Sequence, residues 1–242
     1  MPPVPAHPAL FLDIDGTLLP ITARPADSRA DASLVEELRN LQAAVGGALA
    51  LLSGRPLAVI TEMFTPLVVP AAGVHGLERM SSTGELRRAS VDPSGLEDAR
   101  GALLQLGEIE PRLVLEDKGD AFAVHYRAAP ECAERLWREL QRIAIGLGAG
   151  FHVQPGLYVF ELKPRQPNKG SALLSFMQEA PFHGRMPVAV GDDLTDLHAF
   201  RAAESQGGMA IAVGGRIRAR WQLPDPAALR EWLQRLIVNL RR

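Results

Sequence analysis

Short runs of apolar residues, each followed by glycine or polar residues, recur along the chain. They are Ala9–Leu12, Ala48–Leu52, Leu67–Val69, Pro187–Val190 and Met209–Val213. Short apolar runs bounded by turn residues are typical of strands that are buried on both faces, as in a parallel sheet. The pattern therefore predicts buried parallel strands at these positions.

Apolar residues recur at helical spacing between these runs. Leu34, Val35, Leu38 and Leu41 lie at the spacing of a helix with one buried face. Asp225-Pro226 predicts the start of a C-terminal helix, because aspartate caps a helix and proline suits its first turn. The alternation of buried strands with helices predicts an α/β fold with a Rossmann-like, doubly wound parallel sheet.

The middle of the chain follows a different pattern. One predicted helix begins at Asp92-Pro93, a second contains Leu136 and Leu140, and apolar and polar residues alternate in the strands beside them. These strands form predicted hairpins, 112–118 with 120–127 and 150–154 with 156–163. Such alternation is typical of antiparallel strands that have one face against helices. We therefore predict an inserted α+β domain at residues 85–164, which interrupts a core formed by residues 1–84 and 165–242.

The composition is that of a globular protein. Of the 242 residues, 47% are hydrophobic and 22% are charged, and the formal net charge is −2. A near-neutral chain is not expected to carry a strongly basic face, so we expect no nucleic-acid partner. No apolar stretch reaches the roughly 18–20 residues of a membrane span, so we expect no membrane partner. The single cysteine, Cys132, cannot form an internal disulfide, which fits a reducing compartment and predicts a cytoplasmic location.

Two aspartates follow the first predicted strand, in the segment Asp13-Ile14-Asp15-Gly16-Thr17. Residues two apart on extended backbone point the same way, so their carboxylates repel each other unless a cation lies between them or one is protonated. A solvated Asp-Gly turn is the alternative. Other predicted strand ends carry Ser53, Asp192 and Asp193, and Lys169 begins a helix. Because ligands bind beyond the carboxyl ends of strands in open α/β sheets, we expect these groups to share one crevice.

These groups suit phosphoryl transfer to a carboxylate. We expect Asp13 to attack phosphorus, and Asp15 to protonate the leaving alkoxide and then activate water. Two anions need a cation between them, and we expect Mg²⁺ bound by Asp13, Asp192 and a backbone carbonyl near Asp15. The expected phosphate-binding residues are Asp15, Gly16, Thr17, Ser53, Gly54 and Lys169, of which Lys169 is also a candidate catalytic residue. The sequence has no GxxxxGK[ST] motif, which counts against a P-loop NTPase.

Four of these motifs together resemble the haloacid-dehalogenase superfamily of aspartate-nucleophile phosphatases. They are Asp13-Ile14-Asp15-Gly16-Thr17, Ser53, Lys169 and Gly191-Asp192-Asp193, in that superfamily's order. The resemblance implies a catalytic core of that fold with an inserted cap domain.

A narrower resemblance, to the trehalose-6-phosphate phosphatases, covers nearly the whole chain. It rests on Ser53-Gly54-Arg55, Gly73-Val74-His75-Gly76, Leu115-Glu116-Asp117-Lys118, His125-Tyr126-Arg127, Glu161-Leu162-Lys163-Pro164, Lys169-Gly170 and Gly191-Asp192-Asp193-Leu194-Thr195-Asp196. It implies hydrolysis of trehalose 6-phosphate to trehalose and phosphate, with Mg²⁺ and a mobile cap. The family commonly has acidic residues where this chain has Leu197-His198, although the expected metal ligand Asp192 is intact.

One face of the inserted domain is predicted to carry polar residues of both signs. Alternation along the strands places Glu116, Lys118, His125, Arg127 and Glu161 opposite the apolar side chains. Such a face can accept from and donate to sugar hydroxyls, and the resemblance supports Glu116, Lys118 and Glu161 as sugar contacts. A solvated sheet surface with cross-strand ion pairs is the alternative.

Other polar residues are interpreted in the same way. Arg55 and His75 follow core strands, so we expect them to bind substrate or dock the cap; a helix-end ion pair and a turn histidine are the alternatives. Arg216, Arg218 and Arg220 are interpreted as a surface segment, and Cys132 as structural or incidental.

The sequence as a whole predicts a Mg²⁺-dependent phosphatase that acts on trehalose 6-phosphate through an aspartyl-phosphate. We expect a monomer whose partner is its small-molecule substrate. One alternative is a phosphatase for another sugar phosphate, such as sucrose or mannosylglycerate phosphate, since the core motifs bind only the phosphoryl group. The other is a non-catalytic module that binds sugar phosphate, which the presence of Asp13, Asp15, Lys169 and Asp192 counts against.

Overall fold

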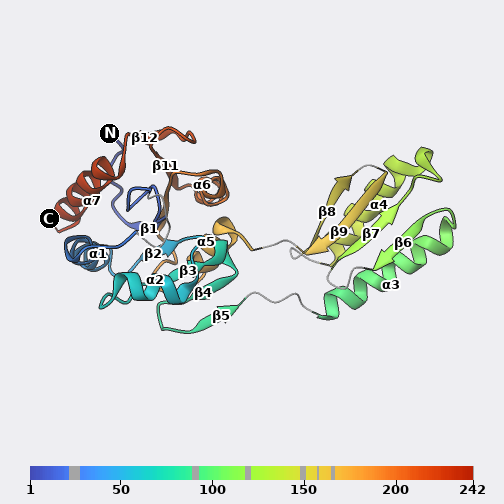
Figure 1. Cartoon of the computed structure of the whole chain (residues 1–242), viewed down its shortest axis with the longest axis horizontal. Coiled ribbons are helices and arrows are strands. Elements are labelled where there is room, and N and C mark those ends of the chain that lie inside the picture. The colour runs from blue at the N-terminus through green and yellow to red at the C-terminus, as the bar shows by residue number, and fades with distance from the viewer. Residues whose placement is uncertain are drawn as a thin grey trace. The chain divides into compact units, whose positions relative to one another are not determined.

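The chain divides into two units in a computed structural model (Figure 1). Unit 1 comprises Met1–Ala89 and Pro167–Arg242, and unit 2 comprises Ser90–Gln166. The structure describes residues 1–21, 28–88, 93–117, 121–147, 151–156, 158–164 and 167–241. Within these ranges, no helix has both the length and the apolar character needed to cross a bilayer.

Unit 1 is built on an eight-stranded sheet, in the order β12-β11-β10-β1-β2-β3-β4-β5. Its strands are β1 (Pro8–Leu12), β2 (Leu49–Leu52), β3 (Ala71–Gly73), β4 (Glu78–Met80), β5 (Leu86–Arg88), β10 (Met186–Gly191), β11 (Met209–Val213) and β12 (Trp221–Leu223). The strands from β12 to β3 pair in parallel, and β4 and β5 extend the sheet in antiparallel fashion. Every residue of β1, β2 and β11 is buried, as the apolar runs predicted.

Helices cover both faces of this sheet. They are α1 (Ala32–Ala44), α2 (Leu57–Phe64), α5 (Lys169–Met177), α6 (Leu197–Ser205) and α7 (Pro226–Leu240), with single 3₁₀ turns η2 (Val74–Gly76) and η4 (Leu194–Asp196). The helices α1 and α7 lie on one side, and α5 and α6 lie on the other (Figure 1). The predicted α7 start is confirmed, since the Asp225 side chain accepts a hydrogen bond from the Ala228 N–H at 2.8 Å. The predicted doubly wound α/β fold is therefore confirmed.

The order of the parallel strands creates a crevice beside β1. From β1 the chain steps to β2 and β3 on one side, whereas β10, β11 and β12 follow one another on the other side. The connections therefore diverge between β1 and β10, and an open sheet binds ligands at such a point, beyond the carboxyl ends of its strands. Asp13 directly follows β1, and Asp192 directly follows β10.

The strand predicted at Leu67–Val69 is wrong, because the strand at this position begins at Ala71. Proline has no N–H to donate to a sheet, and Pro70 contributes only its carbonyl, which accepts from the Leu51 N–H at 2.9 Å. Val68, inside the predicted run, is 74% exposed. Leu67 and Val69 are buried, but the residues that pair with β2 are Ala71 and Ala72, opposite Leu51 and Leu52.

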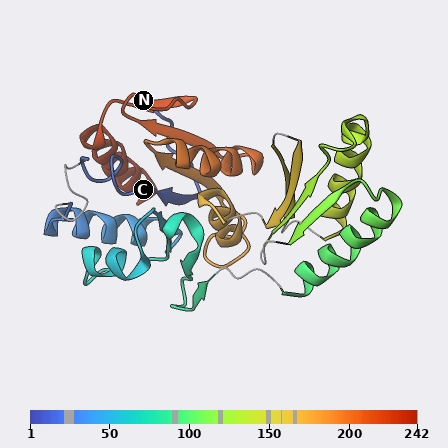
Figure 2. The same cartoon turned by 45° about the vertical axis from the view of Figure 1, so that its right-hand side comes forward.

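Unit 2 is a four-stranded antiparallel sheet with helices on one face (Figure 2). Its strands, in the order β6-β7-β9-β8, are β6 (Val114–Asp117), β7 (Phe122–His125), β8 (Phe151–Gly156) and β9 (Val159–Pro164), and its helices are α3 (Pro93–Ile109) and α4 (Ala133–Gly146), preceded by the turn η3 (Pro130–Cys132). Val124, Leu140 and Leu162 are fully buried in the core between sheet and helices. The predicted α+β character of this segment is confirmed. Residues 86–88 belong to the sheet of unit 1, as β5.

Candidate active site

Asp13 is the buried centre of a charged cluster at the carboxyl end of β1. Its side chain accepts a hydrogen bond from Lys169 Nζ at 2.6 Å on Oδ1 and from Thr17 Oγ1 at 2.9 Å on Oδ2. Burial raises the pKa of Asp13 to about 7, although the Lys169 ammonium acts in the opposite direction. A carboxylate in this position is held in one orientation and is stabilised by a nearby cation.

Lys169 joins two aspartates that lie far apart in the sequence. It is the first residue of α5, whose start is capped by the Asn168 side chain. Its Nζ lies 2.6 Å from Asp13 Oδ1 and 2.6 Å from Asp196 Oδ1. Burial lowers the pKa of Lys169, but the two carboxylates outweigh it and raise the pKa above its ordinary value. The lysine is therefore charged and fixed in place.

Asp196 organises the loop after β10. Its Oδ2 accepts the N–H groups of Asp192 and Asp193, each at 3.1 Å, while its Oδ1 accepts from Lys169. The carboxylate comes this close to the backbone because residue 191 is glycine, since a Cβ there would lie 2.2 Å from Asp196 Cγ. Asp196 was not among the predicted site residues. Its signal in the sequence was a third acid, five residues after Gly191.

Three of these carboxylates lie close enough to share a cation. Asp13, Asp192 and Asp196 each offer an oxygen, and these oxygens all lie within 4.8 Å of one another. All three residues are buried, and burial raises the pKa of Asp192 even though Arg216 donates to it. Carboxylate oxygens are the ligands that hard divalent cations such as Mg²⁺ prefer. The three carboxylates therefore fit such an ion, and a cation between them would offset their mutual repulsion.

Gly16 shapes the wall of this cluster. Its φ is +86°, and a Cβ at this position would lie 2.2 Å from Asp192 Oδ2. Both the backbone conformation and the close approach of the carboxylate require glycine here. The turn after β1 thus allows the loop after β10 to bring its aspartate beside Asp13.

Arg55 holds the second aspartate of the first motif. Its Nε and Nη2 donate to Asp15 Oδ2 and Oδ1 at 2.6 and 2.7 Å. Two parallel hydrogen bonds of this kind fix the carboxylate plane. The Asp15 side chain therefore faces Arg55, so only its backbone carbonyl remains in the predicted metal set.

The loops after β2 and β3 complete the wall of a cavity of about 660 Å³. His75 N–H donates to the Ser53 carbonyl at 3.0 Å, and its imidazole lies against Gly54, where a Cβ would come within 2.7 Å of the ring. Val74 and His75 have φ values of 48° and 56°, a left-handed conformation that costs energy in residues other than glycine. The cavity is lined by Asp13, Asp15, Ser53, Gly54, Arg55, His75, Lys169, Asp192, Asp193, Asp196 and Arg216, among others.

The remaining predicted residues lie in unit 2. Glu116 and Glu161 both pair with Ala123 of β7, which places them on the same face of the sheet. His125 Nε2 lies 3.0 Å from Glu116 Oε2, and the Arg127 guanidinium lies 5.6 Å from the centre of the Tyr158 ring. The predicted Lys118 lies outside the described residues.

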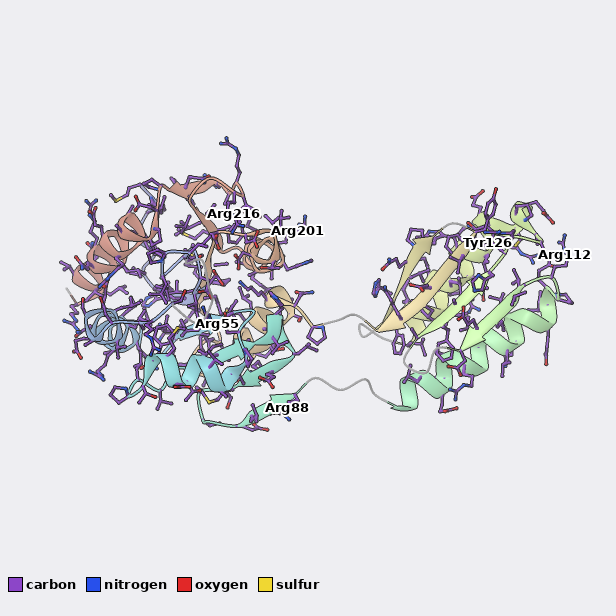
Figure 3. The ribbon with its side chains drawn as sticks, viewed as in Figure 1. Arg55, Arg88, Arg112, Tyr126, Arg201 and Arg216 are labelled. Atoms are coloured by element: carbon purple, nitrogen blue, oxygen red, sulfur yellow. The ribbon has the colours of Figure 1, made fainter. Side chains whose placement is uncertain are left out.

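The structure thus brings the predicted core residues together within unit 1. Figure 3 shows Arg55 and Arg216 in this unit, and both line the cavity. Arg216, interpreted from the sequence as a surface residue, donates from Nη1 to Asp192 Oδ2 at 3.2 Å. Its position after Gly214-Gly215, at the end of a buried strand, was the signal that it faces the same crevice.

Comparison with known proteins identifies similar sequences and folds. The family model described as trehalose-phosphatase matches residues 11–222. The chain is 37% identical over 241 residues to the trehalose-6-phosphate phosphatase of Escherichia coli K12, covering 99% of this chain and 90% of that protein. A solved structure of Aspergillus fumigatus trehalose-6-phosphate phosphatase is similar in fold, with TM-score 0.63, 21% identity and coverage of 97% of this chain and 94% of that one. A haloacid dehalogenase-like hydrolase from B. subtilis also shares the fold, with TM-score 0.54, 16% identity and coverage of 95% and 99%.

Removal of the buried ammonium should destabilise the protein. Lys169→Met leaves Asp13 and Asp196 buried without their shared cation, and we expect it to lower the free energy of unfolding by about 3 kcal/mol or more in metal-free buffer. Urea unfolding followed by circular dichroism measures this. The double variant Lys169→Met/Asp196→Asn should recover part of the loss. If the double variant lost as much stability or more, the proposed repulsion between the Asp13 and Asp196 carboxylates would be contradicted.

A methyl group at position 16 should displace Asp192. Gly16→Ala places a side chain at a left-handed φ and pushes its Cβ against the Asp192 carboxylate. The backbone conformation alone costs about 1–2 kcal/mol, and we expect the free energy of unfolding to fall by clearly more than that. Gly207→Ala is the matched control, because Gly207 has φ +72° and its Cβ would meet nothing within 4 Å. Thermal and urea unfolding compare the two. Equal losses would show that Asp192 does not depend on this close approach.

Proposed function

The chain belongs to the trehalose-phosphatase family, and on that premise we propose that it hydrolyses trehalose 6-phosphate to trehalose and phosphate through an aspartyl-phosphate intermediate. The observation that supports this most directly is the geometry around Asp13. This carboxylate lies at the end of β1, is oriented by Lys169 and Thr17, and lines a cavity with the other polar groups of the site.

In the proposed first step, an Asp13 oxygen attacks phosphorus while the bond from phosphorus to the sugar oxygen breaks. Lys169 balances the negative charge that gathers around the phosphoryl group, and the Ser53 hydroxyl donates to its oxygens. The hydroxyl proton of Thr17 is already donated to Asp13, so Thr17, expected to bind phosphate, is proposed to orient the nucleophile. Dividing the displacement into two steps through a covalent intermediate makes each of them easier. Water then attacks phosphorus, releasing phosphate and restoring Asp13.

Asp15 is the proposed acid and base of the two steps. It gives a proton to the departing sugar oxygen and then takes one from the attacking water. Arg55 donates to both Asp15 oxygens, so proton transfer requires the guanidinium to release one of them. Arg55 thus positions Asp15 in this scheme. Once its guanidinium releases an Asp15 oxygen, it can contact the substrate, as the sequence predicted.

The acidic cluster is the proposed site of Mg²⁺. Asp13, Asp192 and the backbone carbonyl of Asp15 are the proposed ligands, and Asp196 shapes the loop that carries Asp192. When bound, Mg²⁺ supplies a Lewis acid that offsets the repulsion between an anionic nucleophile and an anionic phosphate. The buried, closely spaced carboxylates support this assignment.

The polar sheet face of unit 2 is the proposed sugar-recognition surface. Glu116 and Glu161 project from one face, His125 bonds to Glu116, and Lys163 Nζ lies 3.6 Å from Glu161 Oε2. Carboxylates accept hydrogen bonds from sugar hydroxyls, and cations donate to their oxygens. The assignment of Glu116, Lys118 and Glu161 as sugar contacts is what favours trehalose 6-phosphate over sucrose or mannosylglycerate phosphate.

We also propose that the protein is a monomer and that it is located in the cytoplasm. All the proposed groups of the phosphoryl-transfer site come from unit 1 of one chain, so the chemistry needs no second copy. Sedimentation of the purified protein at micromolar concentration tests the monomer.

Asp13→Asn should abolish phosphate release. The amide cannot act as the nucleophile, and we expect turnover of trehalose 6-phosphate to fall by at least 10³-fold. Circular dichroism should show an unchanged fold, because asparagine keeps the size of the side chain and Lys169 keeps Asp196 as a partner. Turnover near the wild-type rate in this variant would remove Asp13 as the nucleophile.

The sugar-recognition surface is tested by its selectivity. We expect Glu116→Gln/Glu161→Gln to raise the KM for trehalose 6-phosphate by at least tenfold, since hydrogen bonds to charged groups are worth about 1.5–3 kcal/mol. The kcat/KM for p-nitrophenyl phosphate, which has no sugar, should change less than twofold. Glu139→Gln, on α4, is the matched control and should change neither value. Equal losses with both substrates would contradict sugar recognition by this face.

A further inference from the structure

The loop after β11 brings an arginine to the acidic cluster from the solvent side. Gly214, with φ +71°, and Gly215 turn the chain at the end of β11, and Arg216 follows (Figure 3). Its Nη1 donates to Asp192 Oδ2 at 3.2 Å, and its side chain lines the same cavity as Asp13 and Lys169. A cation therefore already contacts the carboxylate that is the proposed metal ligand.

Among the described residues, Lys169, Arg55 and Arg216 are the lysine and arginines that line the cavity, and they are held very differently. The Lys169 side chain is 3% exposed and bonds two carboxylates at 2.6 Å. The Arg55 side chain is 12% exposed and bonds both oxygens of Asp15. The Arg216 side chain is 58% exposed and makes a single, longer contact with Asp192, which is itself only 5% exposed. Of these three, Arg216 can leave its partner for water at the lowest cost, because its head is already hydrated.

We infer that Arg216 competes with the divalent cation for Asp192, and so sets how tightly the site binds metal. The inference rests on the proposed function, in which Asp192 is a ligand of Mg²⁺. In the metal-free protein, Arg216 supplies the positive charge that the buried Asp192 needs. When the ion binds, Arg216 gives up the carboxylate and turns toward solvent.

Charge and geometry support competition over simultaneous binding. Arg216 uses Oδ2, the Asp192 oxygen that would lie nearest to a Cβ at Gly16, on the turn after β1. An ion bound between Asp13 and Asp192 would bring a double positive charge to the carboxylate that Arg216 contacts, and like charges repel. The buried Lys169 cannot move away without depriving Asp13 and Asp196 of their shared cation, so Arg216 is the cation that yields.

Competition of this kind weakens metal binding by a measurable factor. Arg216→Gln removes the charge but keeps a polar side chain of similar reach, and we expect it to tighten the Kd for Mg²⁺ by about tenfold. Arg216→Lys keeps the charge, so its Kd should stay within about twofold of the wild-type value. Arg218→Gln is the matched control, because Arg218 lies two residues further along, is exposed and is not among the residues that line the cavity.

The test is isothermal titration of MgCl₂ into the metal-stripped, full-length protein and these three variants. Thermal unfolding without metal and at saturating Mg²⁺ is the second readout. Arg216→Gln should have a lower Tm than wild type without metal, because Asp192 then lacks its cation, and the difference should disappear at saturating Mg²⁺. Neither measurement depends on catalytic turnover.

The possible results separate this inference from the proposed function. Tighter binding in Arg216→Gln alone supports the competition. An unchanged or weaker Kd in Arg216→Gln overturns the competition and leaves the proposed function in place. Equal tightening in Arg218→Gln also overturns the competition, because it would show a general effect of net charge. A raised KM for p-nitrophenyl phosphate with an unchanged Kd would make Arg216 a phosphate contact and would also overturn it. Wild-type protein that binds no Mg²⁺ at millimolar concentration overturns both.

Discussion

The structure of unit 1 depends on keeping several aspartates close together in a buried place. Asp13, Asp192 and Asp196 are almost inaccessible to water, and their oxygens lie within 4.8 Å of one another. Carboxylates at such distances repel, and burial adds a desolvation cost, so the arrangement requires cations at fixed positions. Lys169 is the cation that meets this requirement, because its two contacts at 2.6 Å join the end of β1 to the turn after β10.

The fold supplies the geometry for that interaction. Parallel strands end at one edge of the sheet, so loops that lie far apart in the sequence meet there, and the strand order opens a crevice between β1 and β10. Gly16 and Gly191 then allow carboxylates to approach the backbone more closely than any other residue would permit. In the proposed metal site, the same repulsion that would destabilise the protein favours the binding of a divalent ion. The site has a buried lysine on one side of these carboxylates and an exposed arginine on the other.

Much of this could be predicted from the sequence, for identifiable reasons. Runs such as Met209–Val213 are apolar throughout, so buried strands are visible directly, and Asp13 and Lys169 lie at positions where strand and helix boundaries are well marked. The strand near Leu67 was misplaced because apolar residues lie on both sides of Pro70, and the missing N–H of proline decides which ones pair. The roles of Asp196 and Arg216 depend on where short turns aim a side chain: the sequence places both residues after buried strands but does not give their partners. The bidentate contact of Arg55 with Asp15 joins residues 40 apart in the sequence, so it too becomes visible only in three dimensions.

The central claim, that Asp13 accepts the phosphoryl group covalently, can be tested by trapping the intermediate. An acyl phosphate on aspartate is reduced by borohydride to homoserine, which changes the mass of the peptide that contains it. The protein would be mixed with excess trehalose 6-phosphate and Mg²⁺, quenched in acid within milliseconds, reduced, digested and examined by mass spectrometry. The account predicts homoserine at position 13 and at no other aspartate, dependent on both substrate and metal. Homoserine at another position, or rapid product formation with no trapped residue across all quench times, would contradict it.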